Sequence, residues 1–239
     1  MAITTLQTIA QLDEFVVAQH SNHRSIGVVP TMGALHAGHL SLVEQSLTQS
    51  DSTIVTIFVN ATQFAAGEDL DEYPRTLESD TQLLANLEGS ENITVFAPTN
   101  DDVYPNDFST TIVPPAVCKK LEGEFRPTHF AGVATVVLKL LNMTRADRAF
   151  FGQKDFQQIA VIKQMVKDLN VSCEIIACPI KRDSDGLALS SRNAYLSPTE
   201  REIALTLNRT LDLVETQIKD GLRDGFEVIT EMRQQLIDG

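Results

Sequence analysis

Short apolar runs alternate with amphipathic stretches along most of the chain. Residues 53–60 are rich in β-branched side chains and apolar throughout, which is typical of a strand buried on both faces of a sheet. Residues 38–49 carry Leu42, Val43 and Leu47 near helical spacing, which predicts a helix. By the same criteria we expect strands at residues 25–30, 93–97, 149–150 and 172–178, and helices at residues 77–87, 132–143 and 157–169.

This alternation of strands and helices indicates the fold class. Consecutive β and α elements pack as a mainly parallel sheet with helices on both faces. We therefore predict an α/β protein with a doubly wound parallel sheet.

The pattern changes after Pro179. Residues 181–186 are polar, and residues 189–193 are typical of a loop. Ser197, Pro198 and Glu200 then combine a capping serine, a proline at the first helical position and a glutamate three residues after the cap, which together predict a helix start. We expect two domains, residues 1–180 and 181–239, of which the second is small and could be truncated.

The composition is that of an ordinary globular protein. Hydrophobic residues make up 43% and charged residues 21%, which argues against disorder. The longest apolar run, residues 131–141, is too short to cross a bilayer and contains Lys139. The N-terminus lacks the basic start and apolar stretch of a secretory signal. The only cysteines are Cys118, Cys173 and Cys178, too few for a disulfide scaffold or a zinc site, so we expect a cytoplasmic protein without a membrane partner.

The charge makes the few basic residues informative. Nineteen Lys and Arg against 32 Asp and Glu give a formal net charge of −13, which repels nucleic acid at long range. An anionic ligand must then be held by a local cluster of donors.

The first candidate cluster is the decapeptide PTMGALHAGH at residues 30–39. It follows a predicted strand and opens a predicted helix, where glycines allow close backbone approach and free N–H groups can bind phosphate. His36 and His39 can donate to phosphate oxygens as charge develops on a leaving pyrophosphate. Ligands of such folds bind at the carboxyl ends of the strands, which favours a phosphate role over two histidines that merely cap a turn.

Further polar side chains follow other predicted strands. Asn60 and Gln63 could orient a small polar substrate, although Asn60 could equally be a strand-end amide that starts a turn. Residues 65–69 are small and polar and could form a mobile lid. Lys154 follows a strand and precedes a helix, as a phosphate ligand would, or it could be a solvated lysine paired with Asp155.

The remaining candidates are weaker when taken alone. The planar fork of Arg126 suits a carboxylate, but a surface arginine and a capping His129 are the simpler interpretation of residues 122–132. Ser190, Ser191 and Arg192 could close over a triphosphate or form a polar linker. The convergence of phosphate-type donors from several loops of an acidic protein nevertheless favours a nucleotide site.

The motifs together resemble the pantoate–β-alanine ligase (pantothenate synthetase) family. They are P-T-M-G-A-L-H-x-G-H at 30–39, F-V-N-x-x-Q-F at 58–64, D-L-D-x-Y-P-R-T at 69–76, R-P-x-H-F-x-G-V at 126–133, F-G-x-K-D-F-Q-Q at 151–158 and D-G-L-A-L-S-S-R-N at 185–193. The resemblance extends from residue 26 to residue 201. It implies a Rossmann-like nucleotidyltransferase fold of the HIGH/KMSKS type with a small C-terminal lid domain.

The resemblance also implies the reaction. ATP, (R)-pantoate and β-alanine would give pantothenate, AMP and pyrophosphate through pantoyl adenylate, a step of pantothenate and coenzyme A biosynthesis. ATP is then a substrate, Mg²⁺ a cofactor, and a homodimer the expected assembly. The alternatives are another adenylyl or cytidylyl transferase and a non-catalytic nucleotide-binding module.

Site residues follow from the same resemblance. His39 would be the proton donor and His36 would assist at the phosphates, while Lys154 and Arg192 would neutralise charge. Gln63 and Gln158 would hold pantoate; Gln63, Arg126 and His129 would border β-alanine; Asp80 would bind Mg²⁺. The positions matched to ATP binding are Met32, Gly33, Ala34, Leu35, His36, Ala37, Gly38, His39, Gly152, Gln153, Lys154, Asp155, Lys181, Leu189, Ser190, Ser191 and Arg192.

Three positions depart from the family pattern. Ala37 replaces a usual acidic residue, Ala61 a usual proline and Gln153 a usual glutamate. The change at Ala61 would leave the loop that carries Gln63 less rigid. We expect all three to tune the site.

Overall fold

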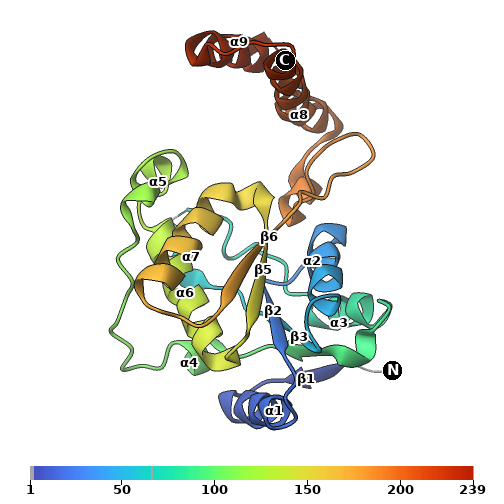
Figure 1. The fold of residues 1–239 in the computed structure, drawn as a ribbon, viewed down its shortest axis with the longest axis vertical. Helices are drawn as coiled ribbons and strands as arrows, with labels where there is room; N and C mark the ends of the chain where they lie inside the picture. Colours follow the sequence, from blue (N-terminus) through green and yellow to red (C-terminus); the bar gives the residue numbers. More distant parts are fainter. Residues whose placement is uncertain (1–2, 66, 239) are drawn as a thin grey trace. The chain divides into compact units, whose positions relative to one another are not determined.

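A computed structural model describes residues 3–65 and 67–238. Within these residues, all strands form one parallel sheet in the order β1-β4-β3-β2-β5-β6 (Figure 1). The strands are β1 (Thr4–Leu6), β2 (Ile26–Thr31), β3 (Ser52–Ile57), β4 (Ile93–Phe96), β5 (Arg148–Gly152) and β6 (Glu174–Cys178). The chain order reverses between β2 and β5, so the carboxyl ends of these neighbours border the crevice in which doubly wound sheets bind ligands.

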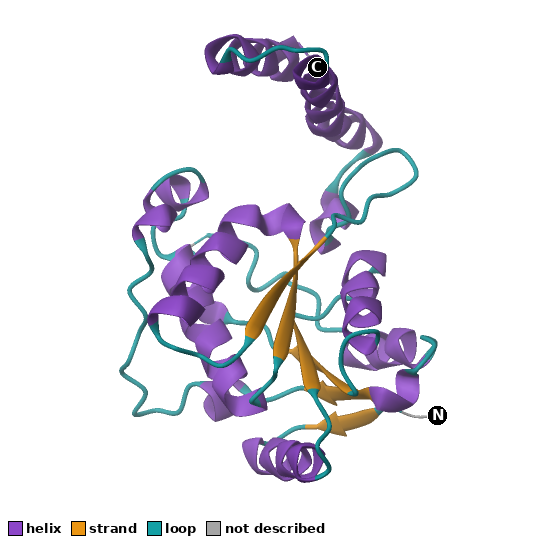
Figure 2. Ribbon diagram, in the orientation of Figure 1, coloured by secondary structure: helices purple, strands orange, loops and turns teal. Residues whose placement is uncertain are grey.

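Helices cover both faces of the sheet (Figure 2). One hydrophobic core joins α1, α6 and α7 to side chains such as Val28 and Ile54, and the other joins α2 and α3 to Val29 and Val55. Alternate residues of β2 and β3 thus enter opposite cores, which explains why both strands are apolar in sequence. The helices of the described residues up to residue 179 are α1 (Ile9–Ser21), α2 (Ala37–Leu47), α3 (Leu77–Ala85), α4 (Asn100–Val103), α5 (Glu122–Phe125), α6 (His129–Thr144) and α7 (Phe156–Asp168).

The predicted fold class is confirmed, with differences at some element ends. The strand expected at 53–60 ends at Ile57, and Ala61–Gln63 forms a 3₁₀ turn, η1, beyond it. The helix expected at 132–143 begins three residues earlier, at His129. The prediction missed this turn because polar His129 and Gly132, a poor helix former, interrupt its apolar pattern. The hydrophobic pattern did not predict β1, α1, α4 or α5, which are short or weakly amphipathic.

The chain divides into two compact units, Met1–Pro179 and Ile180–Gly239. In the second unit, α8 (Pro198–Lys219) begins with the expected capping box, since Ser197 Oγ accepts the Glu200 N–H and the Glu200 side chain accepts the Ser197 N–H. A second helix, α9 (Gly225–Asp238), follows it. The residues expected as a loop at 189–193 lie partly in the 3₁₀ helix η5 (Ser191–Tyr195).

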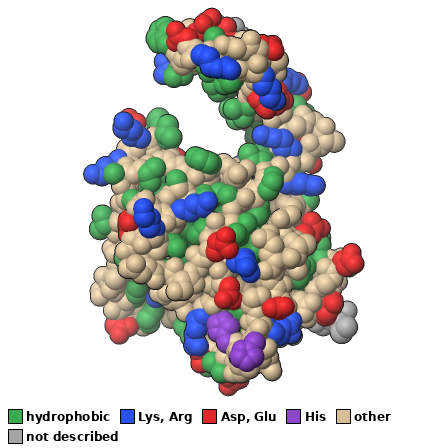
Figure 3. Space-filling model, in the orientation of Figure 1, with side chains coloured by type: hydrophobic (Ala, Val, Ile, Leu, Met, Phe, Trp, Pro, Cys, Tyr) green, Lys and Arg blue, Asp and Glu red, His purple; other side chains and the backbone are tan. Residues whose placement is uncertain are grey.

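The surface fits the acidic composition. On the face drawn in Figure 3, Lys and Arg side chains stand among acidic and apolar ones, and the described atoms of that face form no continuous basic stripe. Among the helices of the described residues, we find none with the length and apolarity that a membrane span requires.

Candidate active site

The turn after β2 places two imidazoles side by side. His36 is the N-cap of α2, and its Nδ1 accepts the Gly38 N–H at 3.1 Å. His39 Nδ1 in turn accepts the His36 N–H at 3.4 Å, and the ring centroids lie 4.1 Å apart. Because both Nδ1 atoms accept hydrogen bonds, the neutral rings carry their hydrogens on Nε2.

The electrostatics of this turn favour the neutral form of both rings. Burial is the main cause of the lowered pKa of His36, and the Lys154 charge adds to it. Burial, followed by His36 and Lys154, lowers the pKa of His39 to about 3. At pH 7 almost no imidazolium of His39 is then present, and its role as proton donor stays a prediction. Each ring can still donate one hydrogen bond through Nε2.

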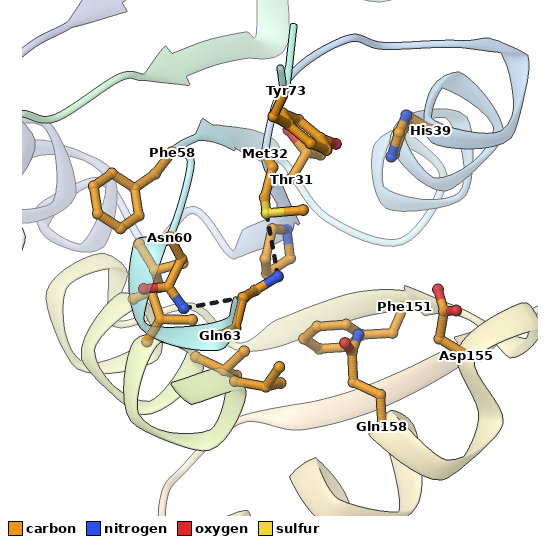
Figure 4. A pocket seen from close by; sticks show the side chains of 15 residues that line it. Thr31, Met32, His39, Phe58, Asn60, Gln63, Tyr73, Phe151, Asp155 and Gln158 are labelled. Carbon is orange, nitrogen blue, oxygen red and sulfur yellow. Dashed lines mark hydrogen bonds between the residues drawn. The ribbon is translucent and has the colours of Figure 1, made fainter. Parts of the chain in front are cut away.

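A cavity of about 180 Å³ lies beside this turn at the carboxyl ends of β2 and β5. Figure 4 shows His39, Gln63, Asp155 and Gln158 around it. These polar groups come from α2, η1, the 3₁₀ turn that precedes α7 and the first turn of α7, so the fold brings together segments that are far apart in sequence. Apolar side chains form much of the remaining wall, among them Met32, Phe58, Val133, Val137, Leu140 and Phe151.

A buried amide orients Gln63. Asn60 is 1% exposed, and its Nδ2 donates to Gln63 Oε1 at 3.0 Å, while its Oδ1 accepts the Tyr104 hydroxyl at 2.9 Å. The Gln63 amide nitrogen is thereby turned towards Met32 Sδ, 3.2 Å away (Figure 4). Asn60 is therefore a satisfied strand-end amide that also lines the cavity, and its role in orienting a substrate stays a prediction.

The backbone of Gln63 is held from α6. A Cβ on Gly132 would lie 2.4 Å from the Thr62 carbonyl oxygen, so only glycine allows the helix to pack this closely on η1. His129 Nδ1 lies 3.0 Å from the Gln63 carbonyl oxygen and donates to it. The start of α6 thus fixes the position of Gln63.

Arg126 is engaged by carboxylates of this chain. Its guanidinium makes a bidentate pair with Glu68, at 2.8 and 2.6 Å, and a further bond of 2.8 Å to Glu122. Glu68 belongs to the segment expected to form a mobile lid, of which Ala66 lies outside the described residues. Any substrate carboxylate that binds Arg126 must compete with Glu68.

Lys154 lies in the 3₁₀ turn η4 (Gln153–Asp155), between β5 and α7. Its Nζ is 2.7 Å from Asp155 Oδ1, and 38% of its side chain is exposed. The ion pair expected as the alternative is present, and the same ammonium also influences both imidazoles. Lys154 therefore stands where it can reach an anion beside the histidines.

The surroundings of Asp80 do not fit its predicted metal role. The side chain is 1% exposed, and its oxygens accept the N–H groups of Ala34 and Leu35 and the Thr76 hydroxyl. Mg²⁺ requires six oxygen ligands and usually keeps several waters. In the described part of the chain, no group of three or more His, Cys, Asp or Glu side chains could hold a metal ion.

The remaining predicted residues lie in the second unit. Lys181 accepts a backbone bond from Leu189 at 3.0 Å, so these two predicted residues are neighbours. Ser190 Oγ accepts the Arg192 N–H at 3.3 Å and caps η5. The ATP-binding role of Lys181 and residues 189–192 stays a prediction.

Sequence reasoning missed several residues of the site. Tyr73 lines the cavity. The Thr76 hydroxyl donates to Asp80, and the Tyr104 hydroxyl donates to Asn60. Tyr73 and Thr76 belong to the motif at 69–76, whose recurrence in the family was the available signal. Nothing local marked Tyr104, because its partner is 44 residues away.

Comparison with known proteins identifies the family. The family model for pantoate-beta-alanine ligase matches residues 4–238. The pantothenate synthetase of Caldicellulosiruptor bescii is 48% identical over 235 residues, which cover 98% of this chain and 82% of that protein.

Solved structures agree with the sequence matches. A pantothenate synthetase from Thermus thermophilus matches with a TM-score of 0.90 at 39% identity, covering 99% of this chain and 83% of that one. A pantoate–β-alanine ligase from Francisella tularensis, complexed with β-γ ATP and β-alanine, matches with a TM-score of 0.80 at 38% identity, covering 98% and 86%. The chain thus belongs to the pantoate–β-alanine ligase family.

Proposed function

We propose that this chain joins (R)-pantoate to β-alanine in an ATP-dependent reaction that passes through pantoyl adenylate and releases AMP and pyrophosphate. The observation that carries the proposal is the meeting of one phosphate-type donor and two amide side chains at one cavity. His39 contributes a donor there, and Gln63 and Gln158 contribute amides. The family assignment supplies the identity of the substrates.

The chemistry requires activation of a carboxylate. A carboxylate does not accept an amine at neutral pH, so pantoate must first attack the α-phosphorus of ATP with departure of pyrophosphate. Stabilising the charge on that leaving group matters more than a strong base. The amine of β-alanine then attacks the acyl carbon of the mixed anhydride, and AMP leaves.

The first turn of α2 and Lys154 would bind the phosphates. The Nε2 hydrogens of His36 and His39 are preorganised by the caps on their Nδ1 atoms, so they need not reorient as charge develops. The ammonium of Lys154 adds a full positive charge. His39 would therefore act as a hydrogen-bond donor in place of the proton donor expected from the resemblance.

The cavity would take pantoate. Its volume of about 180 Å³ and its apolar wall suit a small branched hydroxy acid. The amides of Gln63 and Gln158 would bind its hydroxyl and carboxylate groups. A site that closes over the adenylate would also protect it from hydrolysis.

The β-alanine position stays a proposal from the resemblance, with Gln63, Arg126 and His129 as its neighbours. The β-alanine carboxylate would have to displace Glu68 from Arg126. His129 would act through the Gln63 carbonyl oxygen that it holds. Binding of Mg²⁺ would occur on the phosphates of ATP, since the described residues form no cage for it.

A product assay tests the proposed function. With ATP, Mg²⁺, pantoate and β-alanine the protein should release AMP, and labelled pyrophosphate should exchange into ATP only when pantoate is present. Exchange driven by another acid would favour a different nucleotidyl transferase. Calorimetric binding of ATP without any pyrophosphate release would favour the nucleotide-binding module.

Replacing Gln63 or Gln158 by Ala should raise the KM for pantoate about 10-fold or more while the KM for ATP changes little. Loss of one well-placed hydrogen bond to a bound polar group has this size. Steady-state kinetics with each substrate varied in turn would measure it. Gln164→Ala on α7 is the matched control, because Gln164 bonds only to Asp168 among the contacts described. Equal changes in both KM values would show that the two amides do not select pantoate.

A homodimer and a cytoplasmic location also stay predictions. Sedimentation at several protein concentrations would test the first. Fractionation of cells that express the protein would test the second.

A further inference from the structure

The carboxylate of Asp80 lies against the backbone of the turn that follows β2. Its Oδ1 accepts the Leu35 N–H at 2.8 Å. Its Oδ2 accepts the Ala34 N–H at 3.0 Å and the Thr76 hydroxyl at 3.1 Å. The Ala34 N–H is shared, because Thr76 Oγ1 lies 3.2 Å from the same nitrogen. Both oxygens of a carboxylate that is 1% exposed are thus occupied by donors of this chain.

The turn has a conformation that needs such support. Gly33 and Ala34 have φ angles of 83° and 51°, which places both in the left-handed region. A residue with a Cβ adopts this conformation at a cost, and it persists only where surrounding groups hold it. At Ala34 the holding groups are Asp80 and Thr76, 46 and 42 residues away in sequence. Bonds from N–H groups to a carboxylate are stronger than those between neutral groups.

The turn sets the position of the histidines. His36, the N-cap of α2, follows Leu35 directly, and His39 lies in the first turn of the helix. A shift of the Ala34 and Leu35 peptides would therefore move both Nε2 donors. Misplacement of catalytic groups by about 1 Å can cost about 100-fold in rate.

We infer that Asp80 is a positioning residue for the phosphate-binding turn and is not a ligand of Mg²⁺. The inference rests on the proposed function, in which this turn contacts ATP. A buried carboxylate whose oxygens already accept three hydrogen bonds has no room for an ion that retains its waters. The acidic side chain is needed because two adjacent N–H groups require an acceptor that has no donor of its own.

Two substitutions test the inference. Asp80→Asn keeps the volume, but its NH₂ group cannot accept the N–H that faces it. It should lower kcat/KM for ATP about 100-fold and leave the KM for pantoate unchanged. Thr76→Val removes only one hydroxyl, so it should lower kcat/KM for ATP by about 10-fold. In both variants the Mg²⁺ concentration for half-maximal rate should equal that of the unsubstituted protein.

A structural measurement accompanies the kinetics. The amide hydrogens of Ala34 and Leu35 should exchange with solvent about 10-fold faster in Asp80→Asn, since their acceptor is weakened. Glu78→Gln is the matched control, because Glu78 is an exposed carboxylate in the first turn of the same helix, α3, and both readouts should stay unchanged.

Either of two results would overturn the inference. Activity of Asp80→Asn restored by raising Mg²⁺ or Mn²⁺ would make Asp80 a metal ligand. Unchanged kinetics and unchanged amide exchange would remove it from the support of the turn. If Asp80→Asn does not fold, Thr76→Val tests the support of the turn, because it removes the hydroxyl that bonds to both Asp80 and the Ala34 N–H. Unchanged kinetics and unchanged amide exchange in Thr76→Val would then overturn the inference. If the unsubstituted protein forms no AMP, the proposed function fails, whereas exchange at Ala34 and Leu35 still tests the positioning role.

Discussion

Replacing His39 by Ala should lower the rate of pantoate-dependent pyrophosphate exchange about 100- to 1000-fold. Removal of one preorganised donor to a developing oxyanion has an effect of this size. His39 is such a donor, because its Nδ1 is occupied by the His36 N–H and its Nε2 hydrogen is free to bind phosphate.

Two milder variants separate donation from capping. In His39→Asn, the side-chain oxygen can still accept the His36 N–H, but no group remains at the place of Nε2. In His39→Gln, the amide nitrogen can occupy that place. We expect His39→Asn to exchange pyrophosphate as slowly as His39→Ala, and His39→Gln to be about 10-fold faster than either. Equal rates in Asn and Gln would assign His39 to the helix cap alone. His20→Ala, an exposed histidine on α1, is the control.

The pH profile distinguishes a hydrogen-bond donor from an acid. An imidazolium acid with an ordinary pKa near 6.5 would lose activity about 10-fold per pH unit above that pH. The pKa of His39 is lowered to about 3, so the ring is neutral throughout the range from pH 5 to pH 8. The exchange rate should therefore show no fall from His39 as pH rises over this range. Protonation of His39 should reduce the rate only as pH approaches 3.

Lys154→Ala should lower the adenylation rate by about 100-fold or more. The ammonium is the positive charge that acts on both imidazoles, and a phosphoryl transfer that loses one preorganised charge slows by this amount. Lys154→Arg should recover only part of the rate, because a planar guanidinium does not place its charge where the compact ammonium does. Single-turnover formation of adenylate would measure the effect.

The same variant has a second, independent signature. Since the Lys154 charge lowers the pKa of His36 and His39, its removal should raise both pKa values, which NMR titration of the ring protons would detect. Burial remains in the variant, so both values should stay below 6.5. Lys163→Ala, an exposed lysine on α7, should change neither rate nor titration. Wild-type turnover in Lys154→Ala would remove this lysine from the mechanism.

The sequence pattern was most informative where structure depends on neighbours along the chain. A parallel α/β sheet was predicted from the apolar runs of β2 and β3 and from the periodic helices between the strands. The prediction was possible because a strand buried on both faces needs a continuous run of apolar residues. The capping box of α8 was predictable for the same reason. Helix α1 escaped notice because its buried side chains, Leu12 and Val16, are too few to establish a period.

Contacts between distant segments could not be predicted in this way. Asn60 reaches Gly132 across 72 residues, and Arg126 reaches Glu68 across 58. No local sequence pattern around either partner predicts these two contacts. The family resemblance indicated that these positions matter, but it could not show that the oxygens of Asp80 accept backbone N–H groups or that burial lowers the pKa of His39.

By itself, the sequence determined the fold class and the segments that carry the phosphate-type donors, because hydrophobic period and turn chemistry are local properties. Only the tertiary structure decided which Nε2 hydrogens are available, how far the pKa of His39 falls, and what Asp80 and Arg126 bind. These properties depend on burial and on charges brought from remote parts of the chain, and both come into existence only when the chain is folded.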